Sequence, residues 1–405
     1  MKKLAAALVS AALLLSAAPA FAYEDVTTTD FDLLGDGGEQ PVVAASPAPE
    51  GAININAKSA ILLEQSTGQV LYEQSADEPM PPASITKVMT LLLVMEAIDA
   101  GKFGYDDMVS ASDYACKMGG SQIWLEPGEQ MSVNDLIKAT AISSANDAAA
   151  ALGEYVAGSP EAFVALMNQR AQELGMANTH FENPNGLDAA GHVSTARDIA
   201  IMSCELLKHP DIKKYSTVWM DSLRGGATQL VNTNKLVRFY DGCVGLKTGT
   251  TDGAGSCLSA AAERGGLSLV AVVMGCPTSN DRFNGAKALL DYGFANYEMA
   301  TLQLPETAPT ALKVKGGVTG EVPLRYGSDG TFLVKKGSGA KIVQAVQIAE
   351  DVTAPVEEGQ KLGVVELSLD GEKIGEYPVT AAAPVAKMDF LTGYQILLKY
   401  LFVMR

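Results

Sequence analysis

The apolar residues near the two ends of region 53–300 recur in short runs that are typical of strands. Two runs flank Ser66-Thr67-Gly68 and predict a β-hairpin with glycine at the turn. Further runs follow toward the end of the region, two of them joined by Glu263-Arg264-Gly265-Gly266. The predicted strands cover 60–63, 69–72, 242–248, 256–262 and 268–274.

Between these strands the apolar spacing is helical. The segment from Ser84 to Ala100 is strongly apolar and is stopped by Gly101, which predicts a helix. Ser132-Val133-Asn134-Asp135 is typical of a capping box that opens another helix, and further helices are predicted over 147–155 and about 195–208. A sheet made from both ends of a domain, with helices inserted between, is a mixed α/β arrangement.

From about residue 301 the helical periodicity disappears. Short alternating runs such as Ala311-Leu312-Lys313-Val314 and Val364-Val365-Glu366-Leu367 are punctuated by glycine. This pattern predicts a small all-β C-terminal domain over 301–384. The predicted fold class is therefore α/β over 53–300, with a mixed sheet and inserted helices, followed by this second domain.

The last segment, 385–405, is predicted to form an amphipathic helix. Asp389, Thr392, Gln395 and Lys399 follow one another at spacings of 3, 3 and 4, which places them on one helical face opposite an apolar, aromatic-rich face. Such a helix suits the plane of a membrane interface. Packing against the β domain is the alternative, and Lys399 argues against a spanning helix.

The N-terminus carries an export signal. Met1-Lys2-Lys3 is positive, an apolar run follows, and Ala20-Phe21-Ala22 fits an A-x-A cleavage site, so 1–22 is predicted to be a signal peptide. Residues 23–52 are rich in Thr, Asp, Gly and Pro and predict a disordered acidic leader.

Charge and composition exclude some functions. A formal net charge of −17 argues against nucleic acid as a partner, because phosphate binding requires a basic face. With three histidines and five cysteines that lack C-x-x-C spacing, the chain offers little for a metal site. The cysteines are expected to be mainly buried free thiols, although one or two disulfides remain open.

Ser84-Ile85-Thr86-Lys87 supplies a serine and a lysine at i and i+3, which share one face of a helix. An amine activates a serine hydroxyl when burial or a neighbouring cation lowers its pKa. Alone the motif is weak, and Ser338-Gly339-Ala340-Lys341 is a second copy in a glycine-flanked segment that we interpret as a loop.

Two further motifs distinguish the first copy. Ser144-Ala145-Asn146 follows a helical stretch and supplies a hydroxyl for proton relay and an amide for a substrate carbonyl. Lys247-Thr248-Gly249 ends a strand-like run and supplies positive potential, a carboxylate-binding hydroxyl and a close backbone approach. His192 is interpreted as structural, and Arg197-Asp198 as an ion pair supporting its helix.

The ordered set S-x-x-K, S-x-N and K-T-G is known from penicillin-binding proteins and class A β-lactamases. With these motifs the chain resembles the low-molecular-mass penicillin-binding proteins of the penicillin-binding protein 5 type, which are serine D-alanyl-D-alanine carboxypeptidases. Further matching stretches are 82–87, 144–148, 183–188, 192–198, Ala254-Gly255 and 282–284. The resemblance covers nearly everything after residue 53 and implies a β-lactamase/transpeptidase-like domain, a β-rich stalk and a C-terminal membrane anchor.

The resemblance also implies the roles of the motif residues. Ser84 looks like the nucleophile and Lys87 its base, while Ser144 relays a proton, with Lys247 as a candidate partner in that relay. Asn146 orients the acyl group. The middle residue of this motif, Ala145, replaces the Asp of the family pattern.

The remaining positions that carry over concern substrate binding. Thr248, in its motif with Lys247 and Gly249, contacts the terminal carboxylate, and Arg282 strengthens that contact because its fork of donors matches a carboxylate. The backbone N–H groups of Ser84 and Thr250 form the oxyanion hole.

The implied function is removal of the terminal D-alanine from peptidoglycan stem peptides, without a cofactor or metal. The enzyme is expected to be exported, to lie at the outer face of the cytoplasmic membrane through its C-terminal helix, and to be inhibited covalently by β-lactams. The alternatives are a DD-endopeptidase, a penicillin-sensitive scaffold without turnover, and a class A-like β-lactamase. The lactamase requires a Glu-x-x-x-Asn that is absent between residues 147 and 246.

Overall fold

The computed structural model describes residues 47–49, 52–328 and 330–403. The predicted signal peptide (1–22) and almost all of the predicted leader (23–52) lie outside the described residues. Within the leader, Ala48 lies against a strand, because its N–H donates to Leu71 O at 2.9 Å and Ala48 pairs with Tyr72.

The sheet of the first domain has five antiparallel strands in the order β2-β1-β9-β8-β7. The predicted hairpin and the three later strands are all present, and the later strands are longer than the apolar runs suggested. Their bounds are β1 Ser59–Glu64, β2 Val70–Gln74, β7 Cys243–Thr251, β8 Gly255–Arg264 and β9 Leu267–Cys276. Both ends of the domain thus contribute to one sheet, as the pattern predicted.

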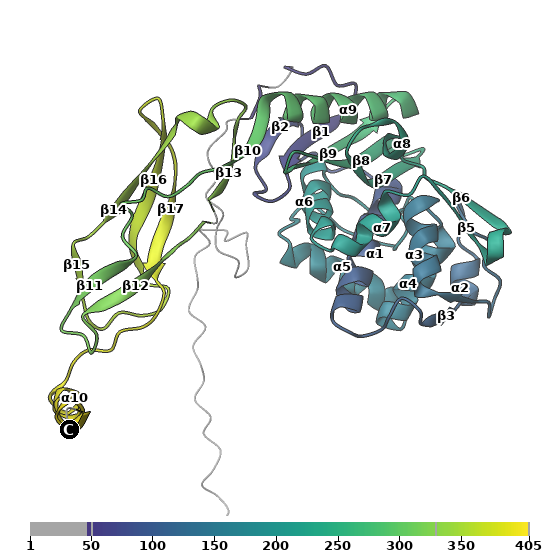
Figure 1. Ribbon diagram of the computed structural model, residues 1–405. Coiled ribbons are helices and arrows are strands. Elements are labelled where there is room, and N and C mark those ends of the chain that lie inside the picture. Colours follow the sequence, from purple (N-terminus) through teal and green to yellow (C-terminus); the bar gives the residue numbers. More distant parts are fainter. Residues whose placement is uncertain (1–46, 50–51, 329, 404–405) are drawn as a thin grey trace, which may run out of the picture. The chain divides into compact units, whose positions relative to one another are not determined.

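Successive residues of the central strands point to opposite faces of the sheet. Leu62 and Val273 pack with helix α9 (Ser279–Asn296), which covers one face, while Ile61 and Val272 pack with the helical layer on the other face (Figure 1). Because both faces are covered, these strands are apolar on both sides.

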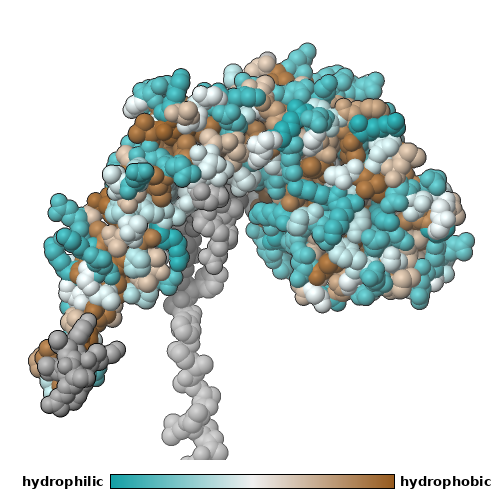
Figure 2. Space-filling model, in the orientation of Figure 1, coloured by the Kyte–Doolittle hydropathy of each residue, from teal (hydrophilic) through white to brown (hydrophobic). Residues whose placement is uncertain are grey.

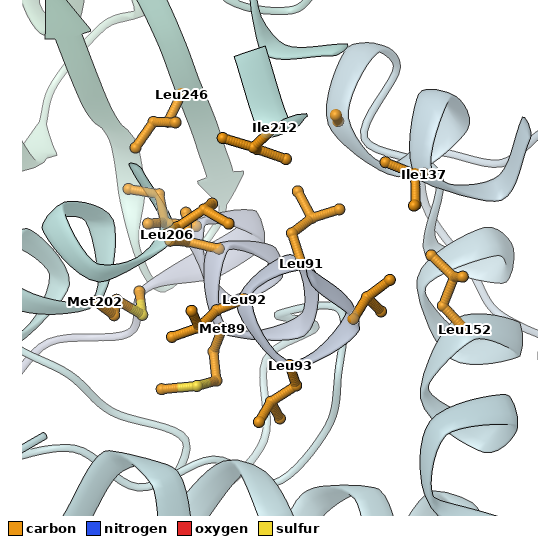
Figure 3. Close-up of a cluster of buried hydrophobic side chains, with 14 of the residues drawn as sticks. Met89, Leu91, Leu92, Leu93, Ile137, Leu152, Met202, Leu206, Ile212 and Leu246 are labelled. Carbon is orange, nitrogen blue, oxygen red and sulfur yellow. The ribbon is translucent and has the colours of Figure 1, made fainter. Parts of the chain in front are cut away.

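Helix α1 (Lys87–Asp99) runs through the middle of the helical layer and is buried on almost every side. Figure 3 shows its Met89, Leu91 and Leu92 surrounded by side chains of the neighbouring helices, among them Leu152 and Met202. A helix that is apolar all round is stable only in such a place. The residue that opens α1 is Lys87, so its position is fixed by a closely packed core.

The predicted helix from Ser84 to Ala100 differs from the structure at its start. A 3₁₀ turn, η1 (Ala83–Thr86), precedes α1 and carries Ser84. The predicted helix starts at Ser132 and Thr195 are confirmed by side-chain caps, although Asp135 does not complete a capping box. The remaining elements are α2 Asp113–Cys116, α3 Val133–Ile142, α4 Asn146–Ala157, α5 Pro160–Glu173, α6 Ala196–Leu207, η2 Pro210–Ile212, α7 Lys213–Ser216, η3 Arg224–Gly226, α8 Leu236–Phe239 and the hairpin strands β3 Met108–Ser110, β4 Gln130–Ser132, β5 Met220–Leu223 and β6 Thr228–Val231.

The second domain is built from strands, as predicted. β10 pairs with β13, and six strands form a sheet in the order β14-β16-β17-β12-β11-β15. Ser338–Lys341, interpreted as a loop, contains the short 3₁₀ turn η4 (Gly339–Lys341). The strand bounds are β10 Tyr297–Thr301, β11 Ala311–Lys315, β12 Glu321–Tyr326, β13 Thr331–Lys335, β14 Ile342–Ile348, β15 Asp351–Thr353, β16 Lys361–Leu369 and β17 Glu372–Ala381.

The last element is helix α10 (Phe390–Val403), which begins where Asp389 Oδ1 accepts the N–H of Thr392 at 2.7 Å. Phe390 is 89% exposed, and Leu391, Tyr394 and Leu397 are also exposed. Figure 2 shows brown, apolar residues in this helix. None of the helices in the described part of the chain is long and apolar enough to cross a membrane.

Candidate active site

The turn η1 brings Ser84 and Lys87 together. In a 3₁₀ turn the side chains at i and i+3 are eclipsed, so they lie closer in register than on an α-helix. Lys87 Nζ donates to Ser84 Oγ at 3.0 Å. Ser84 is half-buried and Lys87 is completely buried, so the hydroxyl is reachable while the amine behind it is not.

Two other acceptors complete the surroundings of the Lys87 amine. Nζ donates to Asn146 Oδ1 at 2.6 Å and to the carbonyl oxygen of Asn185 at 2.6 Å. All three acceptors are uncharged, which leaves the amine without a bonded carboxylate. Burial lowers the pKa of Lys87 well below the ordinary value, the charge of Lys247 lowers this pKa further, and Asp147 opposes the shift. The amine is therefore set to act as a proton acceptor.

Asn146 is the first residue of α4, and its backbone N–H donates to Ser121 O at 2.7 Å. Its Nδ2 donates to Gly119 O at 2.5 Å while its Oδ1 accepts from Lys87. The side chain thus positions Lys87 and keeps one amide hydrogen for another partner.

Ser144 is buried and has a φ of 64°, a left-handed conformation that is uncommon for serine. Within the described residues its hydroxyl makes no hydrogen bond to Lys87 or Lys247, so the expected relay through Ser144 is not assembled in this state.

The K-T-G motif lies on β7, next to η1. Lys247 is buried, and burial followed by the charge of Arg282 lowers the pKa of Lys247 to about 7. Thr248 Oγ1 donates to Thr233 Oγ1 at 2.7 Å. A Cβ on Gly249 would lie 2.9 Å from Pro82 O and 3.1 Å from Ser84 N, so the glycine is required by the close approach of η1. From the sequence alone, we expected this glycine to allow the backbone to approach a ligand.

Arg282 stands in the first turn of α9, which is held by a capping box between Thr278 and Asp281. Its Nη1 donates to Thr250 Oγ1 at 2.7 Å and to Gly249 O at 2.9 Å. Its buried Nε has no partner among the described residues. Arg282 thus contacts β7 two to three residues beyond Lys247, and these two basic groups make the second half of β7 attractive to an anion.

Three residues of this site were missed by sequence reasoning. Asn185 contributes a backbone carbonyl, which no side-chain pattern reveals, although the turn signal Asn183-Pro184-Asn185-Gly186 marks its loop. A Cβ on Gly186 would lie 1.8 Å from Ala83 O, so this loop touches η1 directly. Thr233 has no motif of its own.

The secondary interpretations had mixed outcomes. His192 is buried, with both ring nitrogens hydrogen-bonded, and is not exposed to solvent like a free base. The predicted Arg197–Asp198 ion pair is wrong, because Arg197 binds Asp77 and Glu73, while Asp198 accepts from Thr179. All five cysteines are unpaired.

Comparison with known proteins agrees with this geometry. Residues 43–278 match the family model described as D-alanyl-D-alanine carboxypeptidase, and residues 297–387 match the C-terminal domain of penicillin-binding protein 5. The D-alanyl-D-alanine carboxypeptidase DacF of Bacillus subtilis (strain 168) is 43% identical, over 83% of this chain and 87% of the relative.

Solved structures show the same likeness. Penicillin-binding protein 5 from Haemophilus influenzae superposes with a TM-score of 0.75 at 30% identity, over 85% of this chain and all of that one. Penicillin-binding protein D2 from Listeria monocytogenes in its cefotaxime-bound form has a TM-score of 0.56 at 35% identity, over 60% of this chain and all of that one. The chain belongs to the D-alanyl-D-alanine carboxypeptidase family of penicillin-binding proteins.

Proposed function

We propose that this enzyme removes the terminal D-alanine from peptidoglycan stem peptides through an acyl-enzyme on Ser84. The observation that carries the proposal is the 3.0 Å contact between Ser84 Oγ and a Lys87 amine whose pKa is lowered by burial. When deprotonated, the amine keeps two N–H donors, enough for Asn146 Oδ1 and Asn185 O, and its lone pair takes the Ser84 hydroxyl proton as the oxygen attacks a carbonyl carbon.

The reaction proceeds in two steps. Ser84 Oγ attacks the carbonyl carbon between the two D-alanines, and its proton passes to Lys87. The oxyanion that forms accepts hydrogen bonds from the backbone N–H groups of Ser84 and Thr250. The C–N bond then breaks, the leaving amine takes a proton from Lys87 directly or through Ser144, and D-alanine departs. In the second step a water molecule loses a proton to the same lysine and attacks the ester carbonyl carbon. The bond to Ser84 Oγ then breaks, and Oγ takes that proton from Lys87, which restores both residues.

The terminal carboxylate of the peptide distinguishes a substrate from other peptides. Lys247 and Arg282 provide positive potential along the second half of β7, and Thr248 provides a hydroxyl in the same segment. Arg282 already donates to the hydroxyl of Thr250. It therefore acts on a bound carboxylate through its charge and by orienting this Thr250 hydroxyl. A substrate that lacks the carboxylate leaves these groups without a counter-charge.

The direct test uses the full chain in detergent and a pentapeptide ending in D-Ala-D-Ala. We expect stoichiometric release of D-alanine, none from Ser84→Ala, and weak release from the same peptide with an amidated C-terminus. Release that persists in Ser84→Ala would refute the nucleophile. Rapid turnover of benzylpenicillin, instead of a long-lived adduct, would favour the β-lactamase alternative.

The same acyl-transfer site is proposed to react with β-lactams, in line with the cefotaxime-bound relative. A β-lactam presents a carbonyl and a carboxylate, and its leaving nitrogen stays attached to the acyl group. The departing group therefore cannot diffuse away, which explains why a stable adduct is expected where a peptide is turned over.

The chain is further proposed to divide into a signal peptide (1–22), a leader (23–52), a catalytic domain (53–300), a stalk (301–384) and an anchor (385–405). An anchor that lies in the interface at the outer face of the cytoplasmic membrane is supported by four exposed apolar residues, Phe390, Leu391, Tyr394 and Leu397. Burying them in protein is the competing explanation.

Deleting residues 388–405 tests the anchor. The truncated enzyme should move from the membrane fraction to the soluble fraction with its D-alanine release unchanged, because the catalytic residues lie far earlier in the chain. A double substitution, Phe390→Ser with Leu397→Ser, should weaken membrane binding more than Thr392→Ser with Gln395→Asn on the polar face. Retention of the truncated protein on membranes would contradict the anchor.

A further inference from the structure

His192 lies buried behind the turn that carries Ser84. The residue is 3% exposed, and its ring meets the edge of Phe181 at a centroid distance of 5.8 Å. Its Nδ1 lies 2.9 Å from the backbone nitrogen of Glu182, and its Nε2 lies 2.8 Å from Thr86 Oγ1. Thr86 is the last residue of η1, two residues after Ser84.

The hydrogen-bond partners of His192 and Thr86 determine where the protons of these two side chains lie. A backbone N–H can only donate, so Nδ1 of His192 accepts from Glu182 and carries no proton. Burial lowers the pKa of His192 to about 4, so the ring is neutral near pH 7 and its proton is on Nε2. Nε2–H therefore donates to Thr86 Oγ1, whose own proton goes to Ala83 O at 2.8 Å.

The last acceptor in the chain belongs to the peptide unit that joins Ala83 to Ser84. In a trans peptide the C=O and the N–H point in opposite directions. Holding the carbonyl of Ala83 against Thr86 therefore sets the direction of the N–H of Ser84, one of the two expected oxyanion donors.

This peptide unit needs to be held. Ala83 has a φ of 49°, a left-handed conformation that disfavours a residue with a Cβ, so the turn would relax if it were free. Gly186, from its loop, and Gly249, from β7, lie in close contact with the peptide unit, because a Cβ on either would collide with it. These contacts restrict its position, whereas the Thr86 hydrogen bond defines its rotation.

We propose that His192 is a positioning residue that acts through the Thr86 hydroxyl to aim the backbone N–H of Ser84 into the oxyanion hole. The inference rests on the proposed acyl-transfer function and assigns a task to a histidine outside the three motifs. Direct proton transfer by His192 is excluded in this state, because both ring nitrogens are bonded within the protein and the ring is buried.

Two pairs of variants isolate the hydrogen bonds from packing. Thr86→Val keeps the shape and removes the hydroxyl, whereas Thr86→Ser keeps the hydroxyl. His192→Met removes the donor to Thr86, whereas the side-chain amide of His192→Gln can replace Nε2–H. Thr86→Ala is a second hydroxyl deletion in case the valine disturbs folding, and thermal melting checks each protein.

The measurements are the rate of acylation by a chromogenic penicillin and the stretching frequency of the ester carbonyl in the acyl-enzyme, by infrared difference spectroscopy. Hydrogen bonds to a carbonyl oxygen weaken its double bond and lower this frequency. We expect Thr86→Val and His192→Met to acylate about 10- to 100-fold more slowly, a part of the loss for a deleted oxyanion donor. Their ester bands should move to higher frequency, and their KM for the peptide substrate should change little. Thr86→Ser and His192→Gln should largely restore the wild-type acylation rate and ester band.

The outcomes separate the inference from the proposed function. Unchanged acylation in Thr86→Val and His192→Met overturns the inference, and so does slow acylation with an unshifted ester band, since the turn would then matter only for folding or for the nucleophile itself. If the wild-type enzyme forms no adduct at Ser84, the proposed function fails and the inference falls with it.

Discussion

The chain contains the same four-residue pattern in two regions, Ser84 to Lys87 and Ser338 to Lys341, and each region overlaps a 3₁₀ turn. In the first turn the lysine is fully buried and donates to the serine hydroxyl. In the second the lysine is exposed, and the hydroxyl of Ser338 donates to Lys335 O at 2.6 Å. Local geometry is thus similar, and what differs is the surroundings.

The difference lies in what the rest of the domain brings to each turn. Around Lys87 the domain supplies Asn146, Asn185 and the charge of Lys247 from positions distant in the sequence. The turn η4 has no buried residue. A serine and a lysine three residues apart become a nucleophile and a base only where the domain excludes water from the amine.

The largest effect should come from the two serines. Ser84→Ala should lower D-alanine release by at least about 10⁴-fold, as expected for loss of a nucleophile. Ser338→Ala should leave kcat/KM within about two-fold, because an exposed surface substitution rarely affects a remote site. Comparable losses in both variants would break the comparison.

The second-largest effect should be the difference in acylation rate between substitutions of the two lysines. Lys87→Met removes the base while keeping an unbranched side chain, and acylation by penicillin should fall by about 10²- to 10⁴-fold, the usual range for general base catalysis. Lys341→Met is the matched control and should acylate at the wild-type rate. Rapid acylation of Lys87→Met would assign the base to another group.

The pH dependence sharpens the role of the second buried lysine. Lys87 acts as a base only when deprotonated, so acylation should rise with pH through the pKa of Lys87. The charge of Lys247 lowers that pKa. Removing this charge in Lys247→Gln should move the rising limb to higher pH, whereas Lys247→Arg keeps the charge and the position of the limb. An unmoved limb in Lys247→Gln would contradict this coupling.

The smallest effect concerns stability. The pKa of Lys247 is about 7 in the folded enzyme and 10.5 ordinarily, so the unfolded chain binds more protons between these values. Wild-type stability should therefore rise with pH from about 7 to 10.5. Lys247→Met should raise the free energy of unfolding near pH 7 by about 1–2 kcal/mol, with a gain that shrinks toward pH 10.

Lys341→Met serves as the exposed control, and its thermal melting should follow the wild-type enzyme at every pH. A destabilised Lys247→Met would mean that the Lys247 hydrogen bond to Thr248 O outweighs the cost of burying the amine.

Sequence reasoning succeeded where local pattern decides the structure. The short apolar runs of β1 and β2, the caps at Ser132 and Thr195 and the apolar length of α1 are all local signals, and each element is present. The motif residues Ser84, Lys87 and Asn146 were found because they stand in short patterns, and Lys87 bonds to both of the others.

The rest depends on contacts between distant parts of the chain. Asn185 reaches Lys87 across 98 residues through a backbone oxygen, and any residue type supplies such an oxygen. The Arg197 partners Glu73 and Asp77 lie more than a hundred residues earlier, so the adjacent Asp198 misled the sequence interpretation. The 3₁₀ turn that starts at Ala83 is in close contact with Gly186 and Gly249, which lie more than a hundred residues later, and local propensity does not predict such contacts.

The most direct test of the account locates the penicillin adduct. The full chain is treated with benzylpenicillin, digested and analysed by mass spectrometry, with Ser84→Ala and Ser338→Ala treated in parallel. We predict a single penicilloyl group on the peptide that contains Ser84, present in Ser338→Ala and absent from Ser84→Ala. An adduct on the Ser338 peptide, or on any residue other than Ser84, would contradict the claim that burial of Lys87 makes its serine the nucleophile.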